Sequence, residues 1–218
     1  MKPKLTPELA EIVGIMMGDG YMKNKHNYTH VIKVCGSLSK DRNYLYYVKK
    51  LFIRNFNVIP KLLEYPKKDY LELYVYSKEL VDYFYRVLLI PLSPKTNLSI
   101  PKYIKEDEQL LISFIRGLFD TDGCVTHQID RKKDSEYYYV LVKICTKFLS
   151  FAEDLRDSLI LLGIPAFLCK KGDRFGNTGY DVVVRHKNTT RFFELIGSNN
   201  LRNIRKWEQE WGRWDSNF

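Results

Sequence analysis

The sequence predicts an α+β protein made of two pseudo-symmetric halves, each with the element order αββαββα. Three observations lead to this fold class. The apolar stretch at residues 12–20 is written a second time at 115–123, and both copies end in Asp-Gly. An alternating strand pattern at 32–35 returns at 142–145, and each copy ends in cysteine. The spacing from that cysteine to a later tyrosine is the same in both halves, so the repeat extends well beyond one motif.

Each copy of the repeated stretch carries small residues four positions apart. These are Gly14 and Gly18 in the first copy and Gly117 and Thr121 in the second. Residues at this spacing lie on one face of a helix. Because a face of small residues lets a second backbone approach closely, we expect the two helices to pack against each other.

The acids that end the two copies, Asp19 and Asp122, are the candidate metal ligands. A glycine after the last helical residue is a common stop signal, which places both acids at helix C-termini. The helix dipole is already negative there, so two carboxylates brought together repel each other unless a cation lies between them. We therefore predict Mg²⁺, with the preceding Gly18 and Thr121 as further candidate ligands. A plain helix cap and turn explains one copy, but two copies in matching contexts favour the metal site.

The first half reads as a regular alternation of helices and strands. We expect the first motif helix to begin at Pro7, with Thr6 as N-cap, and to run to Asp19. Hydrophobic periods and turn residues mark the elements that follow. They are strands at 21–25 and 29–36 joined by a turn at 26–27, a helix at 41–56, strands at 61–65 and 70–76, and a helix at 77–89.

The second strand of this half has two unlike faces. Ile32 and Val34 point to one side, and Lys33 points to the other. The predicted sheet therefore has an apolar side for the core and a cationic side for solvent or a partner.

Three prolines between residues 91 and 101 mark a linker between the halves. We assign 1–90 to the N-terminal half, 91–105 to the linker and 106–218 to the C-terminal half with its tail. The second half repeats the order of the first, so a motif helix, two hairpins and two further helices are expected. The tail from residue 203 to 218 is rich in Arg and Trp and is expected to be helical; the sequence assigns it no role.

The net charge of +9 over 218 residues indicates a polyanionic partner, either nucleic acid or an anionic membrane surface. No apolar run reaches the roughly 18 residues of a membrane-spanning helix, and no signal peptide opens the chain. We expect an intracellular, nucleoid-associated protein with no small-molecule substrate. The four cysteines show no zinc-site spacing and are expected to be reduced thiols, and the absence of a Gly-rich phosphate loop argues against ATP-driven chemistry.

At the repeated motif the chain resembles the LAGLIDADG homing endonucleases, in their single-chain form with two motifs. The motif glycines, the terminal acids and the closing glycines all match: Gly14 and Gly117, Asp19 and Asp122, Gly20 and Gly123. Met17 departs from the pattern, since the family often has an acid there. The resemblance implies two halves packed through the motif helices, with antiparallel sheets forming a DNA-binding saddle. It also implies a monomer that makes a double-strand break in DNA for intron homing.

Outward-pointing polar residues on the strands are the candidate DNA contacts, because a two-stranded ribbon fits the major groove. They share one strand parity, which favours a common role over scattered surface charge. They are Lys23, Lys25 and Lys33 in the first half and Gln128, Lys132, Lys143 and Arg185 in the second. Since the halves differ at most of these positions, the target is expected to be long and asymmetric.

Phosphodiester hydrolysis needs an activated water and neutralisation of charge on the phosphate. We expect Asp19 and Asp122 to hold the metal rather than to attack the phosphate. Family enzymes also place lysines around the attacking water, and by position Lys95, Lys40 and Lys147 are the catalytic candidates implied by the resemblance. Phosphate contact or simple surface charge is the alternative for each lysine.

The leading hypothesis is therefore a site-specific, metal-dependent DNA endonuclease. The alternative is a nucleic-acid-binding relative that does not cleave, such as an RNA splicing maturase or a transcription regulator. Both motif acids are present, which favours the enzyme, because a relative without activity is free to lose them. A plain basic structural protein does not explain two helices that end in matching acids.

Overall fold

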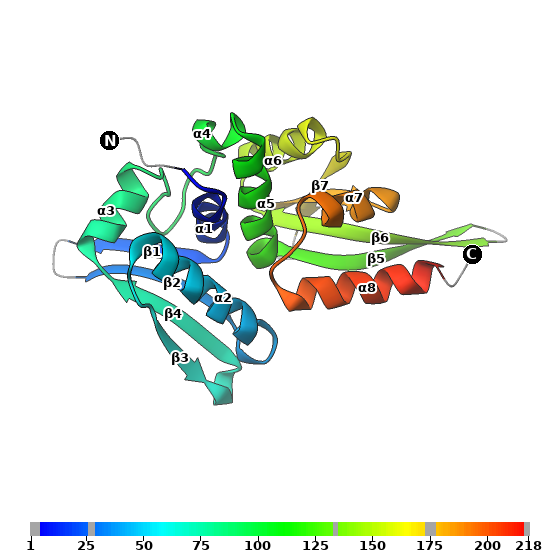
Figure 1. The fold of residues 1–218 in the computed structure, drawn as a ribbon. Coiled ribbons are helices and arrows are strands. Elements are labelled where there is room, and N and C mark those ends of the chain that lie inside the picture. The colour runs from blue at the N-terminus through cyan, green and yellow to red at the C-terminus, as the bar shows by residue number, and fades with distance from the viewer. Residues whose placement is uncertain (1–4, 26–28, 133–134, 173–177, 216–218) are drawn as a thin grey trace.

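The computed structural model describes residues 5–25, 29–132, 135–172 and 178–215. It confirms an α+β fold with two halves of order αββαββα (Figure 1). The predicted turn at 26–27 lies outside the described residues. The first half contains α1 (Pro7–Met17), β1 (Gly20–Lys25), β2 (Thr29–Ser37), α2 (Leu38–Phe56), β3 (Lys61–Tyr65), a 3₁₀ turn (Pro66–Lys68), β4 (Tyr70–Tyr76) and α3 (Lys78–Arg86).

The second half repeats this order and adds two helices. The short helix α4 (Lys102–Lys105) precedes it, and α8 (Leu201–Asp215) follows it. Its other elements are α5 (Glu108–Asp122), β5 (Gly123–Lys132), β6 (Ser135–Thr146), α6 (Leu149–Leu161), β7 (Ala166–Gly172), β8 (Thr178–Arg185) and α7 (Lys187–Leu195).

Each half has one four-stranded antiparallel sheet. The strand orders are β1-β2-β4-β3 and β5-β6-β8-β7, so the two sheets have the same topology. Helices cover one face of each sheet and leave the other face open (Figure 1). Ile32 and Val34 are fully buried on the helix side, while Lys33 lies on the open side, as the alternation predicted.

The two motif helices, α1 and α5, pack against each other at the centre of the molecule (Figure 1). A Cβ atom at Gly14 would lie 2.1 Å from the carbonyl oxygen of Phe114, and one at Gly117 would lie 2.2 Å from that of Glu11. The backbones therefore touch where the glycines are. This confirms that small residues four apart form the contact between the halves.

The predicted end of the first motif helix was wrong by two residues. The helix α1 ends at Met17, so Asp19 lies in the turn before β1, whereas Asp122 is the last residue of α5. The closing glycines also act differently from a left-handed helix cap, because neither has a positive φ. A Cβ atom at Gly20 would lie 2.4 Å from Cα of Met16, so the chain needs glycine there because the strand leaves directly against its own helix.

The segment assigned as a linker packs into the core. Leu98, Ile100 and Ile104 are buried, and the Ile100 N–H donates to Asp154 of α6 at 3.0 Å. The predicted tail helix is present and begins at Leu201. In the described parts of the chain, no helix combines the length and the apolarity needed to cross a membrane.

Candidate metal and nucleic-acid site

The carboxyl groups of Asp19 and Asp122 meet beside the ends of the packed motif helices and hydrogen-bond to each other. Burial raises the pKa of both groups, and the Asp19 carboxylate raises that of Asp122 further, to about 7. Solvent still reaches Asp19, while Asp122 is half-buried. Two carboxylates cannot share this space without a proton or a cation between them. The repulsion predicted from the sequence is therefore present.

Glycine at position 18 allows the close approach of the two acids. A Cβ atom there would lie 2.0 Å from Oγ1 of Thr121 and 3.4 Å from Cγ of Asp122. The Thr121 hydroxyl bonds to its own helix, donating toward the carbonyl oxygens of Gly117 at 3.1 Å and Leu118 at 2.9 Å. The side chains available to ligate a metal here are therefore the carboxyl groups of Asp19 and Asp122.

The chemistry of these donors fits a hard divalent cation. Among the described residues, no group of three or more His, Cys, Asp or Glu side chains is placed to hold a metal. A centre at Asp19 and Asp122 would combine two carboxylates with backbone oxygen and water, the ligands that Mg²⁺ and similar ions prefer. In the described part of the chain, no cluster with thiol or imidazole groups is placed to hold a softer ion.

Lys95, one of the candidates implied by the resemblance, lies beside the two acids. Its Nζ donates to the carbonyl oxygen of Met17 at 2.9 Å and to that of Gly18, two of the unpaired carbonyls at the end of α1. Burial lowers the pKa of Lys95 to about 8, against the opposing effect of Asp122 and Asp19. The Gly18 oxygen, a candidate metal ligand, thus already accepts one hydrogen bond.

The other two candidate lysines lie in different hollows. Lys147 lines a hollow of about 990 Å³ together with Lys95, Asp122 and Lys23. Its Nζ lies 5.1 Å from the ring centroid of Phe148. Lys40 lines a second hollow, bounded by α2 and α8, with neither Lys95 nor Asp122. The structure therefore brings two of the three lysines together and places the third apart.

Strand registers put the described candidate DNA contacts on the open sheet faces, in positions such as Lys143, which is opposite Cys124. Several are already engaged within the protein. Lys33 forms an ion pair with Glu72 at 2.9 Å, and Gln128 donates to Asp130 at 2.7 Å. The Arg185 guanidinium lies 5.8 Å from the Phe167 ring centroid. The side chains of Lys25 and Lys132 lie outside the described residues.

Sequence reasoning missed a buried polar network behind the acids. Asp120 is 1% exposed and accepts hydrogen bonds from the Ser198 hydroxyl and from the Asn199 N–H at 2.8 Å. Burial raises the pKa of Asp120 to about 7. Asn199 also donates to Glu11 at 2.7 Å, which receives the Tyr47 hydroxyl at 2.9 Å. This network joins both motif helices to α2 and to the segment before α8.

A second missed feature is the ion pair between Arg202 and Asp41, at 3.2 Å. Both charges act on the pKa of Asp19, although Lys95 acts more strongly. Asn200 donates to Asp41 at 3.0 Å and fixes its orientation. The only signal in the sequence was the basic character of the tail, which does not reveal a partner on α2.

Comparisons with known proteins agree with this architecture. The family model for the LAGLIDADG-like domain matches residues 109–197. Mesophilic variants of the homing endonuclease I-DmoI align at 21% identity and TM-score 0.61, over 88% of this chain and 95% of theirs. I-DmoI in complex with DNA and Mn aligns at 20% identity and TM-score 0.60, over 88% of this chain and 96% of that one.

The same fold also occurs outside the proteins that carry the name homing endonuclease. The N-terminal LAGLIDADG domain of DUF199/WhiA aligns at 17% identity and TM-score 0.54, over 89% of this chain and 84% of that one. No curated protein sequence matches the chain. Residues 109–197 thus match the LAGLIDADG-like domain, and the chain as a whole shares the LAGLIDADG fold of I-DmoI.

Proposed function

We propose that the protein is a site-specific DNA endonuclease that acts inside the cell as a monomer and makes a Mg²⁺-dependent double-strand break. The observation that carries the proposal is the carboxyl pair of Asp19 and Asp122, held together at the joint between two open sheets. Structures of I-DmoI with DNA and Mn, with target DNA in the presence of Mg, and with DNA and Ca support a divalent ion in a protein of this fold.

Each candidate residue has a role that follows from its position. Asp19 and Asp122 hold the divalent ion, which when bound supplies an activated water and neutralises charge on the scissile phosphate. Lys95 fixes the end of α1 through two carbonyl oxygens and keeps a positive charge beside both acids. Lys147 lies in the same hollow as Lys95 and contacts a phosphate of the DNA strand that enters it. Lys40 contacts a phosphate in its own, separate hollow.

The two open sheet faces would read different sequences. Lys33 and Lys143 occupy matching positions, but the neighbouring outward residues differ between the halves. An asymmetric duplex fits this arrangement better than a palindrome, because a palindrome requires identical contacts on both sides.

The test is cleavage of the uninterrupted allele of the gene that carries this reading frame. Wild type, Asp19→Asn and Asp122→Asn are incubated with that DNA and Mg²⁺, and binding is measured in parallel. Wild type is expected to cut both strands at one place, while the two variants bind with similar affinity and leave the DNA intact. Cleavage by either variant at the wild-type rate would exclude the proposed role of the acids.

The second candidate is a relative that binds nucleic acid without cleaving it, a splicing maturase or a transcription regulator. The fold match to the N-terminal LAGLIDADG domain of DUF199/WhiA supports this alternative. In the same experiment, tight binding of the DNA or of the intron RNA by a wild-type protein that never cuts would select this function.

A further inference from the structure

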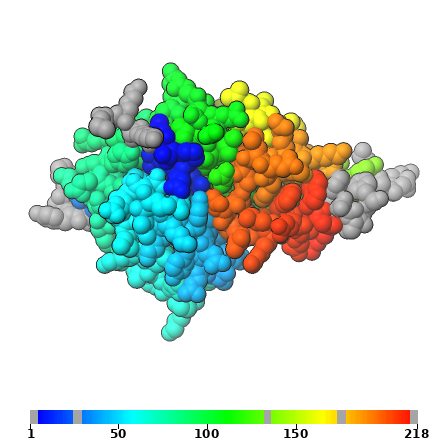
Figure 2. All heavy atoms as spheres, viewed as in Figure 1, coloured from blue at the N-terminus to red at the C-terminus, as the bar shows by residue number. Residues whose placement is uncertain are grey.

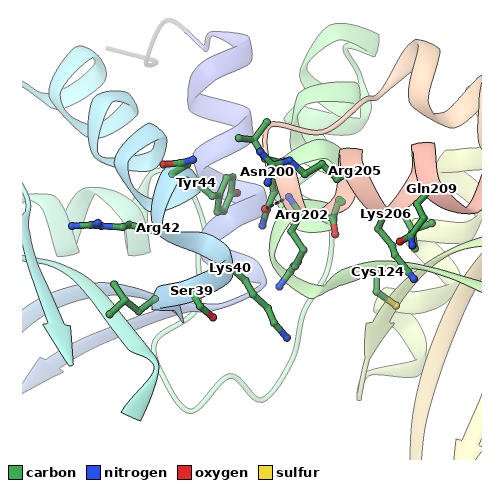
Figure 3. A pocket seen from close by; sticks show the side chains of 15 residues that line it. Ser39, Lys40, Arg42, Tyr44, Cys124, Asn200, Arg202, Arg205, Lys206 and Gln209 are labelled. Carbon is green, nitrogen blue, oxygen red and sulfur yellow. Dashed lines mark hydrogen bonds between the residues drawn. The ribbon is translucent and has the colours of Figure 1, made fainter. Parts of the chain in front are cut away.

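The C-terminal helix α8 has no part in the proposed cleavage, yet it forms one wall of a hollow of about 800 Å³. The opposite wall is the beginning of α2, so the hollow lies between the two halves. Figure 3 shows its labelled side chains: Lys40 and Arg42 come from α2, and Arg202, Arg205 and Lys206 come from α8. No Asp or Glu is among the described residues that line it. We call this hollow the α2–α8 cleft.

The orientation of α8 is fixed by its buried face. Trp207 stacks on Phe193 with ring centroids 4.6 Å apart, Asn203 donates to the carbonyl oxygen of Phe119, and Glu210 is fully buried. Residues 202, 205, 206 and 209 recur at helical spacing and line the cleft instead. The basic residues of α8 are therefore held toward α2 by packing on the other side of the helix.

The two walls of the cleft are tied to each other. Arg202 pairs with Asp41 of α2 at 3.2 Å, and Asn200 donates to the same carboxyl. In Figure 2 the light-blue surface of α2 lies directly beside the orange and red surface of α8. The cleft is therefore a formed feature of the folded chain that spans both halves.

Within the α2–α8 cleft, two cations form no ion pair with the described residues. Arg42 extends away from α8 and pairs with Glu64 at 2.9 Å, and Lys206 pairs with Glu210. Among the described residues, the side chains of Lys40 and Arg205 form no ion pair, and both are exposed. They stand on opposite walls. The Asp69 carboxylate interacts electrostatically with Lys40 but does not line the cleft, so the described lining carries positive charge on both sides.

The α2–α8 cleft borders the second sheet at its edge strand β5. Cys124, the exposed second residue of β5, lines the cleft and is also paired in register with Lys143 on that face. A duplex lying along the sheet would therefore bring its backbone to the cleft. A phosphodiester chain matches the charge of this site, because its regularly spaced phosphates are anionic.

We propose that the α2–α8 cleft binds the sugar-phosphate backbone of duplex DNA through Lys40 and Arg205, and that this is the role of the C-terminal helix. The proposal rests on the proposed function, since it places DNA on the sheet beside the cleft. The helix α8 then adds affinity that does not depend on sequence, because contacts to phosphates read no bases.

The test is the salt dependence of binding to a duplex that the wild-type protein selects, without Mg²⁺, from a pool of random sequences. Each phosphate contact contributes about 0.9 to the slope of log K against log salt concentration. The Lys40→Ala/Arg205→Ala variant is expected to reduce that slope by about 2, and each single variant by about 1. The matched control, Lys102→Ala/Arg156→Ala, removes the same charge from the exposed Lys102 of α4 and the half-buried Arg156 of α6, and is expected to keep the slope.

Equal slopes for the wild type and the Lys40→Ala/Arg205→Ala variant would overturn the proposal, as would an equal reduction in both double variants. A reduction seen with an RNA duplex of the same sequence but not with DNA would overturn the assignment to DNA. If the wild type selects no duplex at all, the proposed function itself fails and the cleft proposal fails with it. Unchanged urea midpoints show that a reduced slope is not a loss of fold.

Discussion

Asp120 is a carboxyl whose protonation depends on folding. Its pKa is raised by burial to about 7, so between about pH 4 and 7 the folded chain binds a proton that the unfolded chain releases. Stability from this group is therefore present at low pH and is lost as pH rises through that window. Asp120→Asn, whose amide can still accept from Asn199 and donate to Ser198, is expected to remove this loss.

The measurement for Asp120 is urea unfolding of wild type and Asp120→Asn from pH 4.5 to 7.5. The free energy of unfolding of the variant, relative to wild type, is expected to rise with pH by at most about 1.4 kcal/mol per pH unit. Acids that do not interact with Asp120 titrate alike in both proteins and cancel in the difference, whereas Glu11, whose charge raises the pKa of Asp120, contributes to it. Parallel curves for the two proteins would show that Asp120 does not titrate in this range.

Lys95 combines a structural and an electrostatic role at the acids. Lys95→Met keeps the length of the side chain but removes the charge beside Asp19 and Asp122. We expect the single-turnover cleavage rate to fall by about 10²–10³-fold, with DNA affinity changed by less than about twofold, since removing one preorganised charge donor costs about this much. Lys102→Met, on exposed α4, is the control. An unchanged cleavage rate would mean that Lys95 only stabilises the end of α1.

At the scale of elements, the contact between α1 and α5 depends on two glycines. In Gly14→Ala the new methyl group would lie 2.1 Å from a backbone oxygen of α5, which no rotamer change can relieve. We expect a loss of about 3 kcal/mol or more in the free energy of unfolding, because overpacking against backbone forces the helices apart. Gly212→Ala, in open space on α8, is expected to stabilise by about 0.5–1 kcal/mol. Similar midpoints for Gly14→Ala and wild type would contradict this description of the helix contact.

The start of α1 was predictable from sequence because its cause is local, whereas α2, predicted to begin at residue 41, begins at Leu38. Thr6 accepts a hydrogen bond from the Leu9 N–H at 3.2 Å, and both residues belong to one turn. The end of α1 was less predictable because its cause lies elsewhere in the chain. The role of Gly20 is to clear Met16 as the strand leaves, and this contact becomes visible only when both elements are placed.

At the scale of the whole molecule, the internal repeat made the fold and the paired acids readable. Asp19 and Asp122 could be identified because each is the image of the other. The repeat gives no prediction where the two halves differ. The helix α8 is such a place, because the first half has no counterpart of it. Sequence reasoning therefore grouped Lys40 with Lys147, although α8 places Lys40 in a separate cleft, and it missed the pair of Arg202 with Asp41.

The paired ends of the motif segments are assigned as a divalent metal centre. The most direct measurement is the anomalous difference map of protein crystals grown with target DNA and Mn²⁺, for wild type and for Asp19→Asn/Asp122→Asn. We predict a Mn²⁺ peak within coordination distance of both carboxylates in wild type and its loss in the double variant. A peak that persists in the double variant, or a wild-type map with Mn²⁺ bound only away from Asp19 and Asp122, would contradict the claim.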